Sequence, residues 1–137
     1  MGGKICIVDH DLASRGYLRE CLEREGHQVV VLESGFKARS CLSEEQFNLI
    51  ILNVDTPGVR ERDFLLHIKN TYPARVLLIV STRGDAFLKD AIDMGVYGFI
   101  YRPFDNQEVC TMVNLLTRQP KVVKGATPYL PDKNPPS

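Results

Sequence analysis

The chain has 137 residues, of which 44% are hydrophobic and 25% charged, a composition that suits one globular domain with a substantial core. Its 17 basic and 17 acidic residues cancel, so the net charge does not favour nucleic acid or an anionic membrane as a main partner. No apolar run reaches the ~18 residues of a membrane span, and the N-terminus lacks the layout of a signal peptide. We therefore expect a cytoplasmic protein.

The cysteines are scattered along the chain and lie among apolar residues. They are Cys6, Cys21, Cys41 and Cys110. This pattern is typical of reduced thiols in the core of a cytosolic protein, and not of a disulfide framework or a zinc site. All four are therefore expected to be free thiols.

Five short apolar runs alternate with five amphipathic stretches. The runs are rich in Val, Ile and Leu without clean polar alternation, which is typical of strands buried on both faces. The predicted strands are Lys4–Val8, Gln28–Leu32, Leu49–Leu52, Val76–Val80 and Gly98–Tyr101. The stretches between them carry apolar residues at helical spacing, so each is predicted to be a helix. In the first helix, this face comprises Ala13, Tyr17, Leu18, Cys21 and Leu22.

Cap and turn residues agree with these boundaries. Gly26 and Gly95 follow helical stretches, where a left-handed cap is expected. Asp105 is the predicted N-cap of the last helix, and Pro57-Gly58 predicts a tight turn after the third strand.

The chain divides by composition into residues 1–118, which form the predicted domain, and residues 119–137. The second segment contains Pro120, Pro128, Pro131, Pro135 and Pro136 and has little apolar content. It is predicted to be an extended or disordered segment. It is either a linker to an output domain or a natural tail.

Strict alternation of strand and helix predicts an α/β fold with a parallel sheet covered by helices on both faces. Five strands fit the doubly wound, flavodoxin-like order 2-1-3-4-5, in which ligands bind beside the carboxyl ends of strands one and three. This topology gathers polar residues around one crevice. They are Asp9, His10, Asn53 and Asp55, with Ser81 or Thr82 and Arg102 at the rim.

The strand ends resemble those of the CheY-like receiver domain of two-component response regulators. The resemblance covers roughly residues 4–118 and is carried by four motifs in order. They are Val8-Asp9-His10-Asp11, Asn53-Val54-Asp55-Thr56-Pro57-Gly58, Ser81-Thr82 and Arg102-Pro103-Phe104. It implies the (βα)5 receiver fold, a role in phosphorelay signal transduction, and a cis bond between Arg102 and Pro103.

In that family, carboxylates hold Mg²⁺, an aspartate accepts a phosphoryl group, and a lysine pairs with it. Here the phosphoacceptor position is Asn53, and an amide is not a nucleophile for phosphoryl transfer. His10 stands at the second acidic position, and imidazole is a poor Mg²⁺ ligand. Arg102 stands at the lysine position and is not equivalent to lysine.

These departures predict a degenerate pocket. Asp9 either holds a metal through water or caps the first helix or pairs with Arg102. Asp11 is either a shifted acid or a helix N-cap. No metal is expected, with Asp9 and Asp11 the only weak ligand candidates, and Mg²⁺ is a cofactor only if a residual site survives. Ser81 stands at the position after the fourth strand where the family has a hydroxyl that contacts the phosphoryl group, with Thr82 as the alternative. Phe99 stands at the position of the aromatic residue that moves inward on activation in the family, and here it is expected to stay buried.

The sequence therefore predicts a pseudo-receiver that is not an enzyme and acts by protein–protein interaction without aspartate phosphorylation. The resemblance implies docking through helix four, strand five and helix five, with Lys89, Tyr97 and Tyr101 on that face. The implied partner is a histidine kinase, an output domain or another signalling protein, and a homodimer through the same face is possible. Nucleic acid and membrane are not expected partners of this domain.

Two alternatives remain open. The first is a receiver that still switches through Asp55 or Asp11 with Mg²⁺. A variant treats Asn53 as a laboratory substitution, but one engineered change does not explain His10 and Arg102 as well. The second is a small-ligand binder on a flavodoxin-like fold, for which no phosphate loop or nucleophile–base pair is found.

Overall fold

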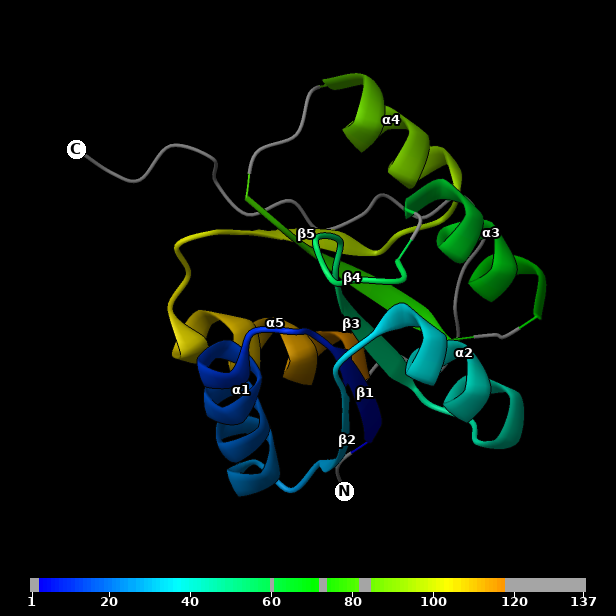
Figure 1. Ribbon diagram of the computed structural model, residues 1–137. Coiled ribbons are helices and arrows are strands. Elements are labelled where there is room, and N and C mark those ends of the chain that lie inside the picture. The colour runs from blue at the N-terminus through cyan, green and yellow to red at the C-terminus, as the bar shows by residue number, and fades with distance from the viewer. Residues whose placement is uncertain (1–2, 60, 72–73, 82–84, 118–137) are drawn as a thin grey trace.

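One parallel sheet organises the domain, and the computed structural model describes residues 3–59, 61–71, 74–81 and 85–117 (Figure 1). The sheet has the order β2-β1-β3-β4-β5, which confirms the predicted fold. The strands are β1 Lys4–Val8, β2 Gln28–Leu32, β3 Leu49–Asn53, β4 Arg75–Val80 and β5 Gly98–Tyr101. The helices are α1 Leu12–Arg24, α2 Gly35–Glu44, α3 Glu61–Thr71, α4 Asp85–Asp93 and α5 Asn106–Thr117.

Helices cover both faces of the sheet, so the core has two halves. Successive strand residues point to opposite faces, and in β1 Cys6 and Val8 pack into one half while Ile5 and Ile7 pack into the other. The first half is closed by α2, α3 and α4 and the second by α1 and α5 (Figure 1). This double burial explains why the strands lack polar alternation.

Local signals in the sequence set the ends of several elements. Asp11 caps α1, because its side chain accepts hydrogen bonds from the N–H groups of Ala13 and Ser14. Gly26 and Gly95 adopt φ of +92° and +88°, the left-handed region that glycine occupies without strain. The Arg102–Pro103 bond is cis, as predicted. No helix in the described part of the chain is long and apolar enough to cross a membrane.

Two expectations about residues of α1 are wrong. Tyr17 does not lie on the buried face of α1; it is 61% exposed, and only Leu18 and Leu22 are fully buried there. Cys21 of α1 and Cys110 of α5 are joined as a disulfide, so these two cysteines are not free thiols. Cys6 and Cys41 are free, as expected.

The strand register brings the functional candidates together. Val8 of β1 pairs with Leu52 of β3, so the residues that follow them, Asp9 and Asn53, lie side by side at the carboxyl edge of the sheet. Parallel strands all end at the same edge. The strand order reverses at β1, which has β2 on one side and β3 on the other, and this switch point opens a crevice between β1 and β3.

Candidate functional site

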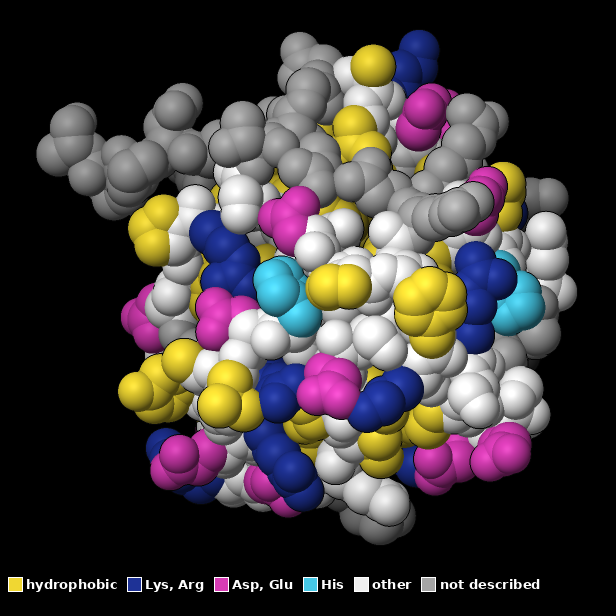
Figure 2. Space-filling view, viewed as in Figure 1, with side chains coloured by type: hydrophobic (Ala, Val, Ile, Leu, Met, Phe, Trp, Pro, Cys, Tyr) yellow, Lys and Arg dark blue, Asp and Glu magenta, His cyan; other side chains and the backbone are white. Residues whose placement is uncertain are grey.

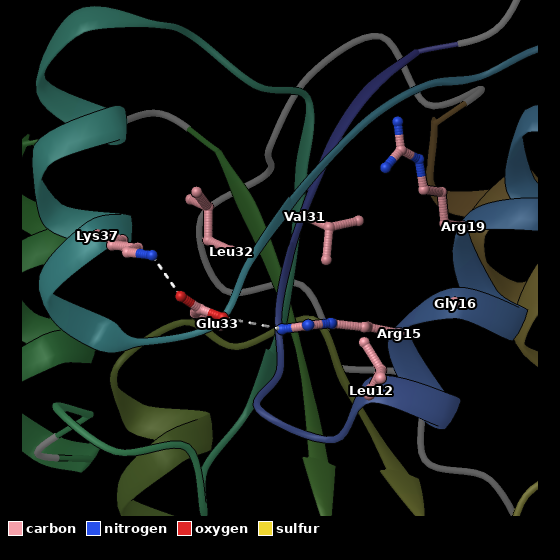
Figure 3. Close-up of a pocket in the computed structure, with 8 residues that line it drawn as sticks. All are labelled: Leu12, Arg15, Gly16, Arg19, Val31, Leu32, Glu33 and Lys37. Atoms are coloured by element: carbon pink, nitrogen blue, oxygen red, sulfur yellow. Dashed lines mark hydrogen bonds and ion pairs between the residues drawn. The ribbon is translucent and has the colours of Figure 1, made fainter.

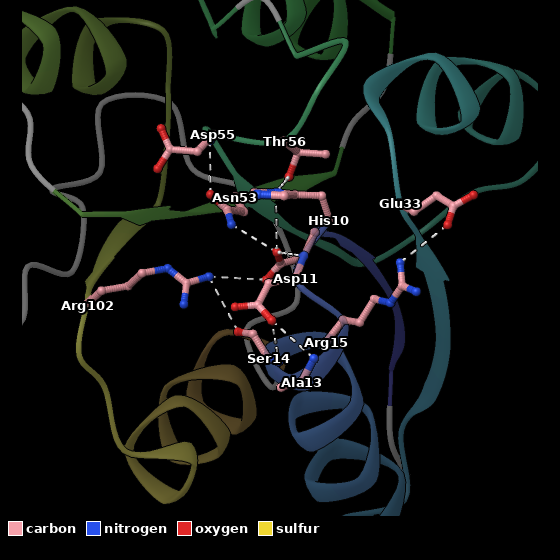
Figure 4. A network of polar contacts seen from close by, with 11 residues as sticks. His10, Asp11, Ala13, Ser14, Arg15, Glu33, Asn53, Asp55, Thr56 and Arg102 are labelled. Carbon is pink, nitrogen blue, oxygen red and sulfur yellow. Dashed lines mark hydrogen bonds and ion pairs between the residues drawn. The ribbon is translucent and has the colours of Figure 1, made fainter.

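A buried contact between Asp9 and Asn53 forms the centre of the candidate site (Figure 4). The Asp9 side chain is fully buried and Asn53 is 2% exposed. The Asn53 amide nitrogen Nδ2 donates to Asp9 Oδ1 at 2.9 Å, and Asn53 Oδ1 accepts the Asp55 N–H at 3.0 Å. The amide therefore satisfies both neighbours, using one donor and one acceptor that a single ionised carboxylate does not combine.

Arg102 supplies the charge that balances Asp9. Its guanidinium Nη2 lies 3.4 Å from Asp9 Oδ2 and 3.4 Å from Ser14 Oγ. The arginine side chain is 26% exposed, while the aspartate side chain is fully buried. The guanidinium also lies over the Phe104 ring, 5.5 Å from its centre. The expected pairing of Asp9 with Arg102 across the pocket is therefore present.

The loop after β1 places its next two residues outside this buried pair. His10 is exposed, and its Nδ1 lies 3.4 Å from Thr56 Oγ1 and 3.9 Å from Asp9 Oδ1. Asp11 turns toward α1 as its N-cap, and its backbone N–H donates to Asp9 Oδ1 at 2.9 Å. Of the two readings of Asp11, the cap is the one that the structure shows.

The remaining candidates lie farther from the centre. The carboxylate of Asp55 is exposed and points away from His10 and Thr56 in Figure 4. Ser81 is exposed directly after β4. Thr82, the alternative hydroxyl, lies outside the described residues, as does the segment 119–137.

The donor set around Asp9 does not fit Mg²⁺. That ion prefers several hard oxygen ligands in octahedral geometry, but Asp9 Oδ1 already accepts from Asn53 and the Asp11 backbone, and Oδ2 faces Arg102. A guanidinium and a divalent cation compete for the same carboxylate. Within the described residues, no group of three or more His, Cys, Asp or Glu side chains is placed to hold a metal. Figure 2 shows acidic and basic side chains interleaved across this face, without a single acidic cluster.

The proposed docking face differs in part from the expectation. Lys89 is exposed and Tyr101 is half-buried, with its ring 6.4 Å from that of Phe99. Phe99 is fully buried. Tyr97 is 8% exposed, with the Arg75 guanidinium 5.3 Å from the centre of its ring. Tyr97 is thus a core residue, and the expectation that it forms an exposed anchor is wrong.

Two site residues were not predicted. Ser14 was missed because a serine inside a helix is usually a solvent-facing residue, although its position three after Asp11 places it on the same side of α1. Thr56 was missed because it lies in a turn, yet it is 2% exposed and its N–H donates to the Asn53 carbonyl at 3.1 Å.

Known proteins are similar to this chain over most of its length. Residues 5–114 match the model of the response regulator receiver domain. The transcriptional regulatory protein CrdR of Helicobacter pylori is 31% identical over 111 residues, which are 80% of this chain and 52% of that protein. Protein PetR of Rhodobacter capsulatus is 30% identical over 128 residues, which are 92% of this chain and 54% of that protein.

A solved response regulator from Thermotoga maritima superposes with a TM-score of 0.78 at 17% identity, covering 87% of this chain and all of that one. The chain spans about half the length of the curated relatives it matches. The observed fold and the match to the family model agree. The chain belongs to the response regulator receiver domain family of two-component signalling.

Proposed function

We propose that this chain is a pseudo-receiver, which transmits a signal by binding another protein without phosphorylation of an aspartate. The observation that carries the proposal is the Asn53 amide at the end of β3, which donates to the buried Asp9 at 2.9 Å. An aspartyl phosphate requires a carboxylate oxygen as its nucleophile. The amide takes the place of that carboxylate and also holds the pocket together.

The same pocket is proposed to work without Mg²⁺. In a catalytic phosphoryl site, a metal and a cation neutralise several carboxylates. Here the Arg102 guanidinium pairs with Asp9, and Asp11 is used as a helix cap. Asp9 and Asp11 therefore stay poor metal candidates, and the domain is not an enzyme.

The proposed partner is a histidine kinase, an output domain or another signalling protein in the cytoplasm. Relatives about twice as long support an attached output domain. The face made by α4, β5 and α5 offers the exposed Lys89 and the half-buried Tyr101, and a second copy is an alternative occupant of that face. Nucleic acid and membrane are not proposed as partners of this domain, whose charges cancel.

Intact mass spectrometry after incubation with acetyl phosphate and Mg²⁺ tests the proposal. The native chain is expected to gain no phosphoryl adduct. Asn53→Asp is the first comparison, and Asn53→Asp with Arg102→Lys is the second, since the pair rebuilds both the nucleophile and the compact ammonium. A phosphoryl adduct on Asn53→Asp would show that residue 53 prevents phosphorylation of the native chain. An adduct that appears only in the double variant would show that residues 53 and 102 both prevent it.

A base-labile phosphoryl adduct on the native chain would contradict the proposal. It would favour the alternative in which Asp55 or Asp11 accepts the phosphoryl group. Asp55→Asn and Asp11→Asn would then separate the two. Loss of the adduct in one variant, at unchanged thermal stability, would identify the residue. Asp11→Asn retains N-cap ability, so the fold is expected to survive that substitution.

A further inference from the structure

A groove along the outer edge of the sheet lies away from the Asp9 pocket. It has a volume of about 500 Å³ and runs between α1 and the start of α2, across β2 (Figure 3). Its lining consists of Leu12, Arg15, Gly16, Arg19, Val31, Leu32, Glu33 and Lys37. The floor is therefore strand backbone and aliphatic side chains, and the walls are mostly cationic.

Strand β2 is the terminal strand on this side of the sheet, so one of its edges has no neighbouring strand in the described structure. Toward β1, the Gln28 N–H donates to the Gly3 carbonyl at 2.9 Å, and the Leu32 carbonyl accepts the Asp9 N–H at 3.0 Å. Backbone direction alternates along a strand. The N–H and C=O groups of Val29 and Val31 therefore point outward, which leaves two donors and two acceptors on the free edge.

The walls of the groove carry an excess of positive charge. The lining includes three cations, Arg15, Arg19 and Lys37, and one carboxylate, that of Glu33. Arg19 also pairs, at 3.0 Å, with Glu23, which lies outside the lining. Glu33 accepts a hydrogen bond from the Lys37 ammonium, and its carboxylate lies 3.7 Å from the Arg15 guanidinium. The hydrogen bond from Lys37 and its charge hold the pKa of Glu33 below its ordinary value. All of these side chains are wholly or partly exposed, so a bound carboxylate competes with Glu33 for cations that already favour anions.

Gly16 places no side chain on the α1 side of the groove. Nothing lies within 4 Å of the position where a Cβ would stand on this glycine. An extended chain beside β2 can therefore pass α1 without meeting a side chain at that position. Leu12, 71% exposed, borders the same stretch and offers an apolar contact to one side chain of such a chain.

We propose that this groove binds an extended acidic segment of a partner protein, which adds to the sheet as a strand beside β2. Strand addition supplies backbone hydrogen bonds as the main attraction, and side-chain pockets supply selectivity. The Val29 and Val31 backbone groups would provide the first, and Arg15, Arg19 and Lys37 would select acidic side chains.

Charge argues against two other occupants. Residues 118–137 of this chain contain Arg118, Lys121, Lys124 and Lys133 but only Asp132 as an acid, so they are repelled by the walls. A second copy paired edge to edge would bring the same three cations against one another. The proposal does not depend on Asn53 or on the proposed function. The groove shares no side chain with the Asp9 pocket, and the two sites touch through the backbone hydrogen bond from the Asp9 N–H to the Leu32 carbonyl.

The test uses a fluorescent synthetic peptide of about ten residues in which Glu alternates with Val or Thr, a strand-forming composition. A peptide with Lys in place of each Glu is the control. The acidic peptide is expected to bind the full chain saturably. In NMR spectra, the largest changes in backbone amide chemical shift are expected at Val29 and Val31, and these two amides should become newly protected from hydrogen exchange. Binding should weaken as salt is raised.

Matched variants locate the binding surface. Arg19→Glu is expected to weaken binding at least about tenfold, as for charge reversal against an acidic partner. Arg24→Glu is the control, because Arg24 lies on the same helix, pairs with Glu20 as Arg19 pairs with Glu23, and is outside the groove. Val31→Pro removes an outward N–H and leaves the bonds to β1 in place, so it should also abolish binding.

Several results would overturn the proposal. They are no saturable binding, equal binding of the Lys peptide, equal loss with Arg19→Glu and Arg24→Glu, or shifts confined to other residues. Protection of the Val29 and Val31 amides in the free chain would mean that its own residues or a second copy already cover the edge. Self-association of Arg15→Glu/Arg19→Glu without peptide binding would show that the cations only guard an exposed edge strand.

Discussion

At the scale of single residues, the pocket is held by one neutral amide and one ion pair. Asp9 is a fully buried carboxylate that pairs with the Arg102 guanidinium at 3.4 Å, and the exposed His10 imidazole lies 3.9 Å away. A buried charge that loses its partner keeps its desolvation cost. The ion pair therefore matters more for avoiding a bare carboxylate than for the attraction that it supplies.

Arg102→Ala is expected to lower the free energy of unfolding by about 2–3 kcal/mol, less than for a fully buried pair because the arginine is partly exposed. Asp9→Asn in the Arg102→Ala background should recover much of this loss, since a neutral amide needs no cation. Urea unfolding of the four proteins of this cycle at pH 7 measures the coupling. Additive losses in the double variant would show that the two residues do not interact.

The free thiols give a pH-dependent contribution to stability. Burial raises the pKa of Cys6 to about 12, and burial with the Glu45 hydrogen bond raises the pKa of Cys41 to about 11, from an ordinary value of 9.0. The folded chain thus keeps protons that the unfolded chain releases above pH 9. Stability from these groups is complete below pH 9 and is lost as pH rises toward 12.

Cys6→Ala is expected to reduce the decline of unfolding free energy between pH 9 and the alkaline limit of the folded state. Its stability near pH 7 should be lower because a buried side chain is shortened. Chemical unfolding at pH 7, 9 and 10.5 separates the change of unfolding free energy with pH from the loss of stability that the substitution causes at pH 7. An unchanged slope would mean that Cys6 ionises in the folded state as readily as in the unfolded one.

At the scale of elements, a glycine contact fixes α2 against the turn that follows β3. A Cβ on Gly35 would lie 2.2 Å from the Gly58 carbonyl oxygen, and the Gly35 N–H donates to the Pro57 carbonyl at 2.8 Å. Gly58 itself has φ +84°. Since this turn carries Asp55 and Thr56, the start of α2 supports one wall of the site.

Gly35→Ala is expected to destabilise the domain by at least about 2 kcal/mol, because the backbone on both sides must move. Gly16→Ala is the matched control in α1. It has open space around the added methyl group and should stabilise the helix by about 0.5–1 kcal/mol. Thermal unfolding of both variants checks the contrast, and similar changes in the two proteins would refute the contact argument.

At the scale of the whole molecule, the sequence predicted what depends on periodicity and strand order. Alternation of apolar runs and helical stretches predicted the sheet, and that sheet places Asp9 beside Asn53. It did not predict that β4 begins at Arg75, a charged residue that is buried because it bonds the Leu116 carbonyl and lies against Tyr97. Helical spacing also could not tell how wide the buried face of α1 is, and Tyr17 falls outside it.

Long-range pairing was the other limit of the sequence. Cys21 and Cys110 are separated by 89 positions, and nothing in either neighbourhood indicates a partner. Their proximity follows from the packing of α1 beside α5, which only the fold specifies. The contact between Ser14 and Arg102 spans 88 positions and likewise follows from the fold.

The Cys21–Cys110 link makes overall stability dependent on redox conditions. Joining α1 to α5 restricts the unfolded chain over a long loop, which is worth about 2–4 kcal/mol in unfolding free energy. The oxidised protein, kept free of reductant, should show two titratable thiols under denaturing conditions and four after reduction. Reduction should also lower the urea concentration at the midpoint of unfolding. Cys21→Ser with Cys110→Ala should be insensitive to reductant. Four thiols in the untreated oxidised protein would contradict the link, and an unchanged midpoint on reduction would show that the link adds no stability.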